Sequence, residues 1–277
     1  MDLFISLIVG LLVGTHMSIW GMYKDSPHEG YTNRQFFRSI IIAGIWGPVI
    51  WLFTRLDMSQ VSSYWLLFGS TYAMERLTLE YYKTFLREQD QSKYTIPMQF
   101  AVFGKVVKSR AVRLLVAAGY ITGILLIGAG VWYYHNNSEA IGWTPWFTVF
   151  VFGSIGGWVS AFGGAWKDAP IEGFETFKFF RSPAVSLFYG ILTALFTANV
   201  FLITLCAIGY TIASIETYKT FAFPSKPRGK FANTPIHFPE QLKKRQKYVP
   251  IYVAIWIGII TVFIMSIMQP QNGLISF

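Results

Sequence analysis

Cysteine and charged residues are scarce in this sequence. Only 13% of the 277 residues are charged, whereas 53% are hydrophobic and 18% are aromatic. Soluble domains carry about 25% charged residues, and so few charges cannot provide a water-facing surface for a chain of this length. The single cysteine, Cys206, excludes an intramolecular disulfide and a cysteine-based metal or iron–sulfur site. The composition therefore predicts an integral membrane protein.

Motifs for haem, zinc and nucleotides are also missing. The four histidines include no pair at the spacing that places two ligands on one helical face. His16, inside the first apolar segment, is expected to be a buried, hydrogen-bonded side chain. The glycine-rich stretch 153–164 lies within another apolar segment, and its Gly153 and Gly157 have the spacing of closely packed membrane helices. We therefore expect no haem, no iron–sulfur cluster and no nucleotide-binding loop.

Long apolar segments dominate the chain. They extend for roughly 16 to 23 residues without the alternation of barrel strands, which indicates transmembrane helices. They predict an all-α, polytopic membrane helix bundle with about eight transmembrane helices, at residues 3–23, 39–55, 61–83, 112–134, 146–166, 183–197, 199–218 and 249–269. The apolar run from 183 to 218 is too long for one crossing, so a turn is required near residues 197–199.

Positive charge is concentrated in a few places. Of the 23 lysines and arginines, 21 fall in four stretches, at residues 24–38, 83–113, 167–181 and 219–247. Basic loops stay on the cytoplasmic side of a membrane, so we predict a multi-pass protein with both termini on the non-cytoplasmic side. The run KKRQK, residues 243–247, precedes the last apolar segment and favours contact with anionic membrane lipids. No nucleic-acid partner is expected, because no nucleic-acid-binding motif surrounds it.

One charged motif occurs twice. Residues 21–39, GMYKDSPHEGYTNRQFFRS, align without gaps to residues 164–182, GAWKDAPIEGFETFKFFRS, with ten identities in nineteen positions at an offset of 143 residues. A second match follows, of EYYKTF at 80–85 with ETYKTF at 216–221. Four crossings return a chain to its starting side, so the duplication predicts two parallel four-helix repeats within one membrane domain, residues 1–138 and 139–277.

The repeated motif carries the candidate site residues. Carboxylates four residues apart share one face of a helix, and oxygen ligands of this kind suit a hard divalent cation such as Mg²⁺. Nearby cations would bind a phosphate or diphosphate, and in a compact bundle all these groups would converge on a cytoplasm-facing pocket. The predicted metal ligands are Asp25, Glu29, Asp168 and Glu172, the predicted phosphate-binding residues are Lys24, Lys167, Arg38, Arg181, Lys83 and Lys219, and the supporting carboxylates are Glu80 and Glu216.

A structural interpretation of the same motif remains open. SPHE at 26–29 has the pattern of a helix start, with Ser26 as N-cap, Pro27 at the first helical position and Glu29 returning to the cap. The glutamates of the third helices can pair with the lysine three residues further on. In this interpretation, the motif is a corner of the fold and binds no ligand.

The layout resembles the UbiA-type intramembrane prenyltransferases. In that family, a helix ends in an Asn-Asp-x-x-Asp-type motif followed by Arg-Pro, a helix end with tyrosine and lysine follows two helices later, and the plan is then repeated. WKDAPIEGFETFKFFRSP at 166–183 has acidic and Arg-Ser-Pro elements in comparable order, and ETYKTF at 216–221 follows after two helices. Lys24 and Lys167 stand where the family has asparagine. The resemblance implies magnesium-dependent transfer from a prenyl diphosphate.

Three functions agree with these features. The first is a metal-assisted membrane enzyme that acts on a lipid-linked or prenyl (di)phosphate at the cytoplasmic face, with an isoprenoid or lipid phosphate as substrate. The second is a non-catalytic structural or accessory subunit of a larger complex, in contact with other membrane subunits. The third is a transporter, although the apolar segments contain few ionisable residues at mid-membrane depth. The enzyme is the function that we expect.

Overall fold

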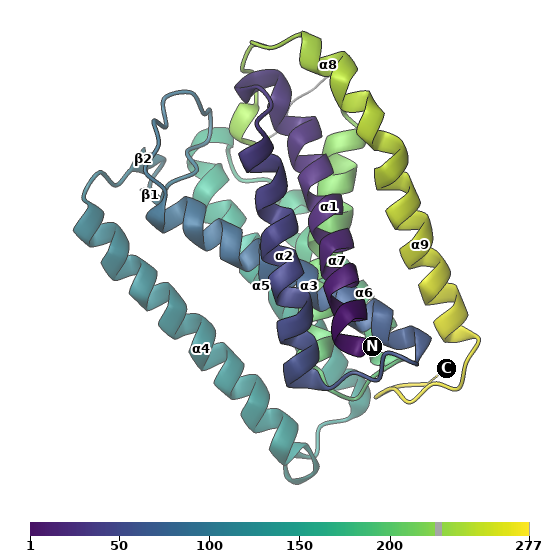
Figure 1. The fold of residues 1–277 in the computed structure, drawn as a ribbon. Coiled ribbons are helices and arrows are strands. Elements are labelled where there is room, and N and C mark those ends of the chain that lie inside the picture. The colour runs from purple at the N-terminus through teal and green to yellow at the C-terminus, as the bar shows by residue number, and fades with distance from the viewer. Residues whose placement is uncertain (225–228, 277) are drawn as a thin grey trace. The chain divides into compact units, whose positions relative to one another are not determined.

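The computed structural model describes residues 1–224 and 229–276 (Figure 1). They form two compact units. Residues 1–76 and 208–271 form the first, called unit 1, and residues 77–207 with the tail that begins at Asn272 form the second, called unit 2. Apart from one short β-hairpin, the regular structure of the described residues is helical. An all-α fold is therefore confirmed.

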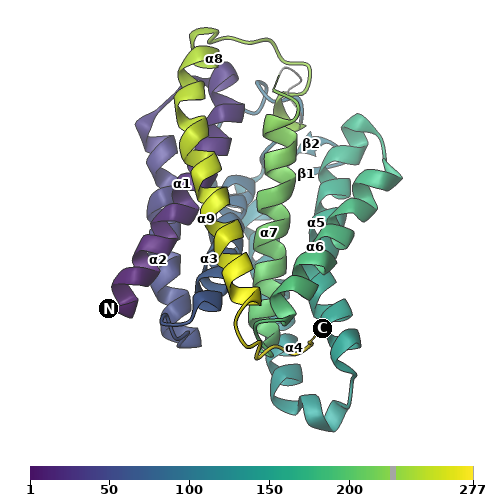
Figure 2. The ribbon, with the colours of Figure 1, turned by 90° about the vertical axis from the view of Figure 1, so that its right-hand side faces the viewer.

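Unit 1 is built from both ends of the chain. It contains α1 (Asp2–Glu29), α2 (Asn33–Thr54), most of α3 (Val61–Tyr81), the second part of α7 (Val200–Phe221), η2 (Gly229–Phe231), α8 (Glu240–Lys244), η3 (Arg245–Tyr248) and α9 (Val249–Ile267). Figures 1 and 2 show that α9 runs beside α1. Ile19 and Trp20 of α1 pack with Tyr252 of α9 in a buried cluster, which ties the two ends of the chain together.

Unit 2 contains the middle of the chain. After the end of α3 come the π-helix η1 (Tyr82–Leu86), the strands β1 (Ala101–Val102) and β2 (Lys105–Val106), α4 (Arg110–Ile141), α5 (Pro145–Glu172), α6 (Thr176–Ala194) and the first part of α7. The two strands pair antiparallel. Val131 and Tyr134 of α4 pack with Phe152 of α5 and Val200 of α7, and this cluster holds the end of α4 in the unit.

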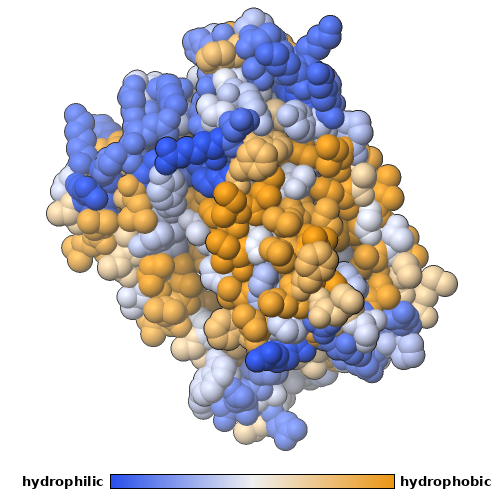
Figure 3. Space-filling model, viewed as in Figure 1, coloured by the Kyte–Doolittle hydropathy of each residue, from blue (hydrophilic) through white to orange (hydrophobic). Residues whose placement is uncertain are grey.

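Each predicted apolar segment corresponds to a helix of the structure. Among the described residues, six helical stretches are long and apolar enough to cross a membrane: α1, α2, α4, α5, α7 and the continuous stretch Glu240–Ile267 that includes α9. On the face shown in Figure 3, apolar residues cover the outer sides of α1, α2 and α9, and polar residues lie over α8. These helices support an integral multi-pass membrane protein. The number of eight crossings remains a prediction, since α3 and α6 are not among the six.

The turn predicted at residues 197–199 is confirmed. α6 ends at Ala194 and α7 begins at Val200. Asn199 caps α7, because its Oδ1 accepts hydrogen bonds from the N–H groups of the two residues that follow Val200, at 3.0 and 3.3 Å. A side-chain acceptor at this place satisfies donors that a helix start leaves open. Two helices therefore form within one apolar run.

Glycines bring α1 against α2 and α5 against α6. A Cβ at Gly14 would lie 2.4 Å from the Cα of Ile40, and a Cβ at Gly157 would lie 2.5 Å from the Cα of Pro183. Only glycine fits where two backbones touch in this way, as predicted for the glycine-rich stretch of α5. The offset of 143 residues that relates the charged motifs also relates the packing glycines, which are Gly10, Gly14 and Gly47 in one pair and Gly153, Gly157 and Gly190 in the other.

Each unit combines segments from both halves of the sequence. In unit 1, α1 contacts α8, η3 and α9. In unit 2, α5 contacts β1, and Trp166 Nε1 donates a hydrogen bond to the carbonyl oxygen of Ala101 (3.1 Å). Each basic loop therefore packs against the acidic helix of the other half. The repeat boundary between residues 138 and 139 remains a prediction from the sequence, and the spatial units are divided elsewhere.

Candidate functional site

In both copies of the charged motif, the acidic pair lies at the end of a long helix. α1 continues through its proline to Glu29, and α5 continues through its proline to Glu172. The glycine that follows has a positive φ in each case, 77° at Gly30 and 85° at Gly173. Glycine is the residue that most easily adopts such a φ and so ends a helix. The two acidic pairs therefore lie at helix C-termini.

The interpretation of SPHE as a helix start is wrong. Ser26 is buried in the last turn of α1, and its carbonyl oxygen accepts a hydrogen bond from the N–H of Gly30 (3.0 Å). Pro27 lies inside the helix, where it has no N–H to donate to the carbonyl oxygen of Tyr23. That oxygen instead accepts a hydrogen bond from Arg245 Nη1 (2.7 Å). The pattern misleads because Arg245, which is distant in the sequence, donates the hydrogen bond that Pro27 cannot donate.

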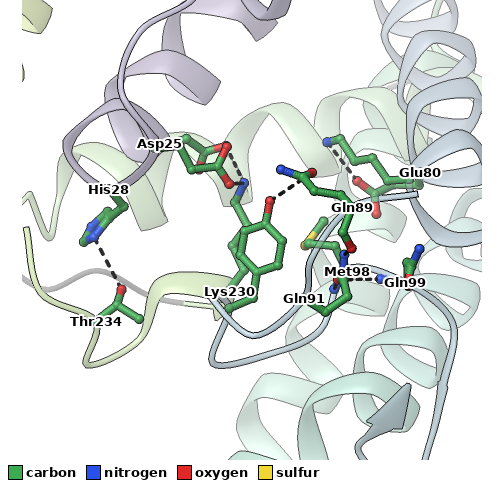
Figure 4. Close-up of polar contacts among 12 residues, drawn as sticks. Asp25, His28, Glu80, Gln89, Gln91, Met98, Gln99, Lys230 and Thr234 are labelled. Atoms are coloured by element: carbon green, nitrogen blue, oxygen red, sulfur yellow. Dashed lines mark hydrogen bonds and ion pairs between the residues drawn. The ribbon is translucent and has the colours of Figure 1, made fainter. Parts of the chain in front are cut away.

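In unit 1, a lysine bridges the acidic pair. Lys230 Nζ lies 2.8 Å from Asp25 Oδ2 and 3.3 Å from Glu29 Oε1 (Figure 4). The side chains of Lys230 and Glu29 are largely buried, with 11% and 8% of their area exposed. The two carboxylates thus share one helical face, and an ammonium group lies between them.

A second charge cluster joins α1 to α7. Lys24 Nζ lies 3.3 Å from Glu216 Oε2, and Lys219 Nζ lies 3.5 Å from Glu216 Oε1. The charged groups of Lys24 and Arg76 both lie over the ring of Trp20, at 5.9 and 5.3 Å from its centroid, within the range of cation–π attraction. Two predicted phosphate-binding lysines are therefore paired with a predicted supporting carboxylate.

In unit 2, the corresponding acidic pair is bridged by a lysine of the next helix. Lys178 Nζ, in the first turn of α6, lies 3.0 Å from Asp168 Oδ2 and 2.9 Å from Glu172 Oε2. The side chains of Lys178 and Glu172 are 31% and 28% exposed, more than the 11% and 8% of Lys230 and Glu29 in unit 1. Asp168, at 22%, is less exposed than Asp25, at 31%. Partial burial disfavours the charged form of Lys178, but its hydrogen bonds to Glu172 and Asp168 outweigh this effect and raise its pKa above the ordinary value.

The remaining predicted residues of unit 2 make separate contacts. Lys83, in η1, lies 3.5 Å from Glu80 Oε1. Lys167 Nζ lies 3.6 Å from Met98 Sδ. The loop that carries Met98 is ordered by Gln91, whose Oε1 accepts hydrogen bonds from the backbone N–H groups of Met98 and the next residue, at 2.8 and 3.1 Å (Figure 4). Lys167 of α5 therefore joins the acidic end of this helix to the ordered loop.

Arg38 and Arg181 occupy matching places on the helices that follow the acidic ends. Arg38 lies on α2 and Arg181 on α6, and both are partly buried. Each stands nine residues after the glutamate of its acidic pair, Glu29 or Glu172. The structure thus places one partly buried guanidinium group on the helix that leaves each acidic end.

Sequence reasoning missed the two bridging lysines. Only three residues separate the end of α5 from the start of α6, so Lys178, in the first turn of α6, was a detectable neighbour of the acidic end. The signal for Lys230 was weak. A loose match of residues 93–100 with 230–238 pairs it with Lys93, but the ammonium group of Lys93 lies over the ring of Tyr94, 5.0 Å from its centroid.

The acidic ends fit one mode of magnesium binding. In the part of the chain that the structure describes, no group of three or more histidine, cysteine, aspartate or glutamate side chains is arranged to hold a metal ion. Mg²⁺ is often held by only one or two carboxylates, with water and substrate phosphates completing its shell. Two carboxylates on one helical face fit this mode, and the bridging lysine now holds the position that a cation would take.

His16 is buried and hydrogen-bonded, as predicted. Its Nδ1 lies 3.2 Å from the hydroxyl oxygen of Tyr72, and its ring stacks on Tyr252 with centroids 4.0 Å apart. Trp20 Nε1 donates to the same hydroxyl oxygen (2.8 Å). These rings pack α1, α3 and α9 together in the interior of unit 1.

Comparison with protein-family models, with curated proteins and with solved structures gives no match. The function must therefore be argued from the two acidic helix ends.

Proposed function

We propose that this protein is an integral membrane enzyme that acts on a lipid-linked or prenyl (di)phosphate with the help of Mg²⁺. The observation that carries the proposal is the acidic end of α5, where Asp168 and Glu172 lie at 3.0 and 2.9 Å from one ammonium group. Two carboxylates that enclose a cation at a helix end, in an apolar membrane protein, suit the head group of a lipid phosphate bound with a divalent cation. The apolar helices of the unit would accommodate its chain.

The residues of unit 2 have separate roles in this proposal. Asp168 and Glu172 hold the cation, and Lys167 and Arg181 bind phosphate oxygens through charge-assisted hydrogen bonds. Lys178 holds the acidic pair together in the absence of ligand and turns to the phosphate when ligand binds. The bound cation would neutralise the charge that develops on the leaving phosphate or diphosphate.

Unit 1 has the same plan in a more closed form. Asp25 and Glu29 correspond to the metal ligands, and Lys24 and Arg38 correspond to the phosphate-binding residues. The side chain of Lys230 is 11% exposed, compared with 31% for Lys178. We therefore assign the reaction to unit 2.

The finer topology belongs to the same proposal. We infer eight transmembrane helices in two parallel four-helix repeats, with the basic stretches on the cytoplasmic side and both termini on the other side. The offset common to the charged motifs and the packing glycines supports the duplication. Cysteines introduced at the exposed, equivalent positions Thr32 and Glu175 should react with a membrane-impermeant reagent from the same side. Labelling from opposite sides would exclude parallel repeats.

Ligand-dependent thermal stability tests the enzyme proposal. Mg²⁺ with inorganic diphosphate, and Mg²⁺ with a long-chain prenyl diphosphate, should each raise the Tm of the purified protein, because a ligand that binds only the folded state stabilises it. Asp168→Asn should abolish the rise, whereas the matched variant Asp25→Asn should retain it. The proposal would be contradicted if neither ligand raised the Tm of the wild type, or if the ligands raised the Tm of Asp168→Asn as much as that of the wild type.

The second candidate is a non-catalytic subunit of a membrane complex. The observation that favours it is that each acidic pair is already bridged by a lysine of the same chain, and carboxylates that already have a cationic partner need no ligand. A subunit of this kind would show no ligand-dependent rise in Tm. It would instead be purified in constant proportion with other membrane proteins when the tagged chain is extracted in mild detergent.

A further inference from the structure

The segment that leads into α9 has two different faces. α8 and η3, Glu240–Tyr248, run without a break into α9. Gln241 and Arg245, four residues apart, are buried, with 8% and 6% of their area exposed. Lys243, Lys244 and Lys247 are exposed. We call these three side chains the lysine face.

The lysine face lacks an acidic partner within the described part of the chain. Lys24, Lys178, Lys219 and Lys230 all form ion pairs with carboxylates, whereas none of the three lysines of the face forms one there. The acidic residue of the segment, Glu240, accepts a hydrogen bond from Gln241 (3.3 Å). Three neighbouring cations repel one another, so an anionic partner outside the chain would relieve this repulsion.

The position of the lysine face identifies the class of that partner. The face lies within one candidate membrane-spanning stretch, Glu240–Ile267, directly before its apolar part. Ile251, Val253 and Ile257 of α9 are 48%, 46% and 60% exposed, as expected of side chains in contact with lipid tails. In Figure 3, the polar surface over α8 borders the apolar surface over α9. Basic residues at this depth meet the head groups of anionic lipids.

The buried side of the same segment is fastened to the acidic end of α1. Arg245 Nη1 donates to the carbonyl oxygen of Tyr23 (2.7 Å), its guanidinium group lies 4.0 Å from the centroid of the Tyr23 ring, and Gln246 Nε2 donates to the Tyr23 hydroxyl (3.1 Å). Arg245 thus supplies a hydrogen-bond donor to the carbonyl oxygen that Pro27, which has no N–H, leaves without its helical partner. In this arrangement the lysine face is exposed while Arg245 is buried.

The chain before α8 closes over the same helix end. The carbonyl oxygen of Pro27 accepts hydrogen bonds from the N–H groups of His237 and Phe238 (both 3.0 Å). Phe231 stacks on His28 with ring centroids 4.5 Å apart. Together with Lys230 and Arg245, these contacts make residues 229–248 a strap across the end of α1.

We propose that anionic lipid head groups bind the lysine face and thereby hold the strap on the acidic end of α1. The head groups bind Lys243, Lys244 and Lys247 best when all three are exposed together, as they are in the docked strap. A ligand that prefers one of two conformations shifts the population toward it. The charge of the membrane therefore controls access to Asp25 and Glu29, whether or not the protein is an enzyme.

Hydrogen exchange in nanodiscs tests the proposal. The full chain is placed in phosphatidylcholine alone and in equal parts phosphatidylcholine and phosphatidylglycerol, and exchange is followed at the His237 and Phe238 amides. Phosphatidylglycerol should slow exchange by several-fold, and added salt should reverse the effect because it screens exposed charges. The triple variant Lys243→Gln, Lys244→Gln, Lys247→Gln should lose the effect, whereas the triple arginine variant should keep it.

A matched control and a second measurement make the result decisive. Lys105→Gln with Lys108→Gln removes two exposed lysines of unit 2 and should leave the effect intact. Native mass spectrometry should detect fewer retained phosphatidylglycerol molecules on the triple glutamine variant, even if that variant is less stable. Equal exchange in the two membranes, or equal lipid retention by the variant and the wild type, would overturn the proposal.

Discussion

The two acidic helix ends have nearly the same sequence and differ in the lysine that bridges their two carboxylates. At the end of α1, the lysine is Lys230, 201 residues from Glu29 in the sequence, and its side chain is 11% exposed. At the end of α5, the lysine is Lys178, only six residues from Glu172, and its side chain is 31% exposed. The motif therefore specifies a carboxylate pair on one helical face, but it does not specify the partner or the degree of burial.

Substitution of the two bridging lysines should give the largest difference in the free energy of unfolding between the two ends. Lys230→Met removes a largely buried ammonium group from the equally buried Glu29, and breaking a buried ion pair costs about 3–5 kcal/mol. Lys178→Met acts at a more exposed site, where an ion pair contributes about 1 kcal/mol or less. Chemical unfolding in one detergent measures both losses, with Lys230→Arg as the control that keeps the charge. Equal losses would show that the two ends do not differ in the energetics of burial.

Substitution of the terminal glycines should give a smaller contrast. Gly30 and Gly173 combine positive φ with ψ values of 174° and 166°, a conformation that other residues adopt only at a cost of about 1–3 kcal/mol. A Cβ at Gly30 would also lie 3.3 Å from the ring of Phe238, whereas a Cβ at Gly173 would meet no atom within 4 Å. Gly30→Ala should therefore lower the free energy of unfolding more than Gly173→Ala.

A double-mutant cycle isolates the contribution of the strap to that difference. In a Phe238→Ala background, the excess loss caused by Gly30→Ala should disappear, because its contact partner is gone. If Gly30→Ala still lowered the free energy of unfolding more than Gly173→Ala in this background, contact with Phe238 would not be the cause of the difference.

The pH dependence of the Lys178 bridge should give the smallest effect. Its pKa is raised in the folded protein, so its contribution to stability is complete below the ordinary lysine pKa and is lost as the pH rises through the folded-state pKa. The difference in Tm between the wild type and Lys178→Met should therefore shrink in the alkaline range. A difference that stays constant from neutral to strongly alkaline pH would contradict the bridge.

Local chemistry explains which predictions succeeded. The lengths of the apolar runs located the helices and required the turn between α6 and α7, and the spacing of Gly153 and Gly157 predicted close helix packing. All these features depend on residues within a few turns of one another. The spacing of the carboxylates likewise predicted that Asp168 and Glu172 share one helical face.

The unsuccessful interpretation of SPHE had the opposite cause. Pro27 is favoured at a helix start because its missing N–H leaves no helical bond unmade there. In α1 the missing bond is replaced by Arg245, which reaches the carbonyl oxygen of Tyr23 from 222 residues away in the sequence. No local pattern contains that information.

The sequence by itself determined the places of the helices and of the acidic pairs at their ends, because segment length, glycine and side-chain spacing act along the chain. The tertiary structure alone decided that Lys230 bridges Asp25 and Glu29, and that Arg245 donates to the carbonyl oxygen of Tyr23 in α1. The physical reason is that the free energy of an ion pair or hydrogen bond depends on distance through space and on burial from water, and not on separation along the sequence.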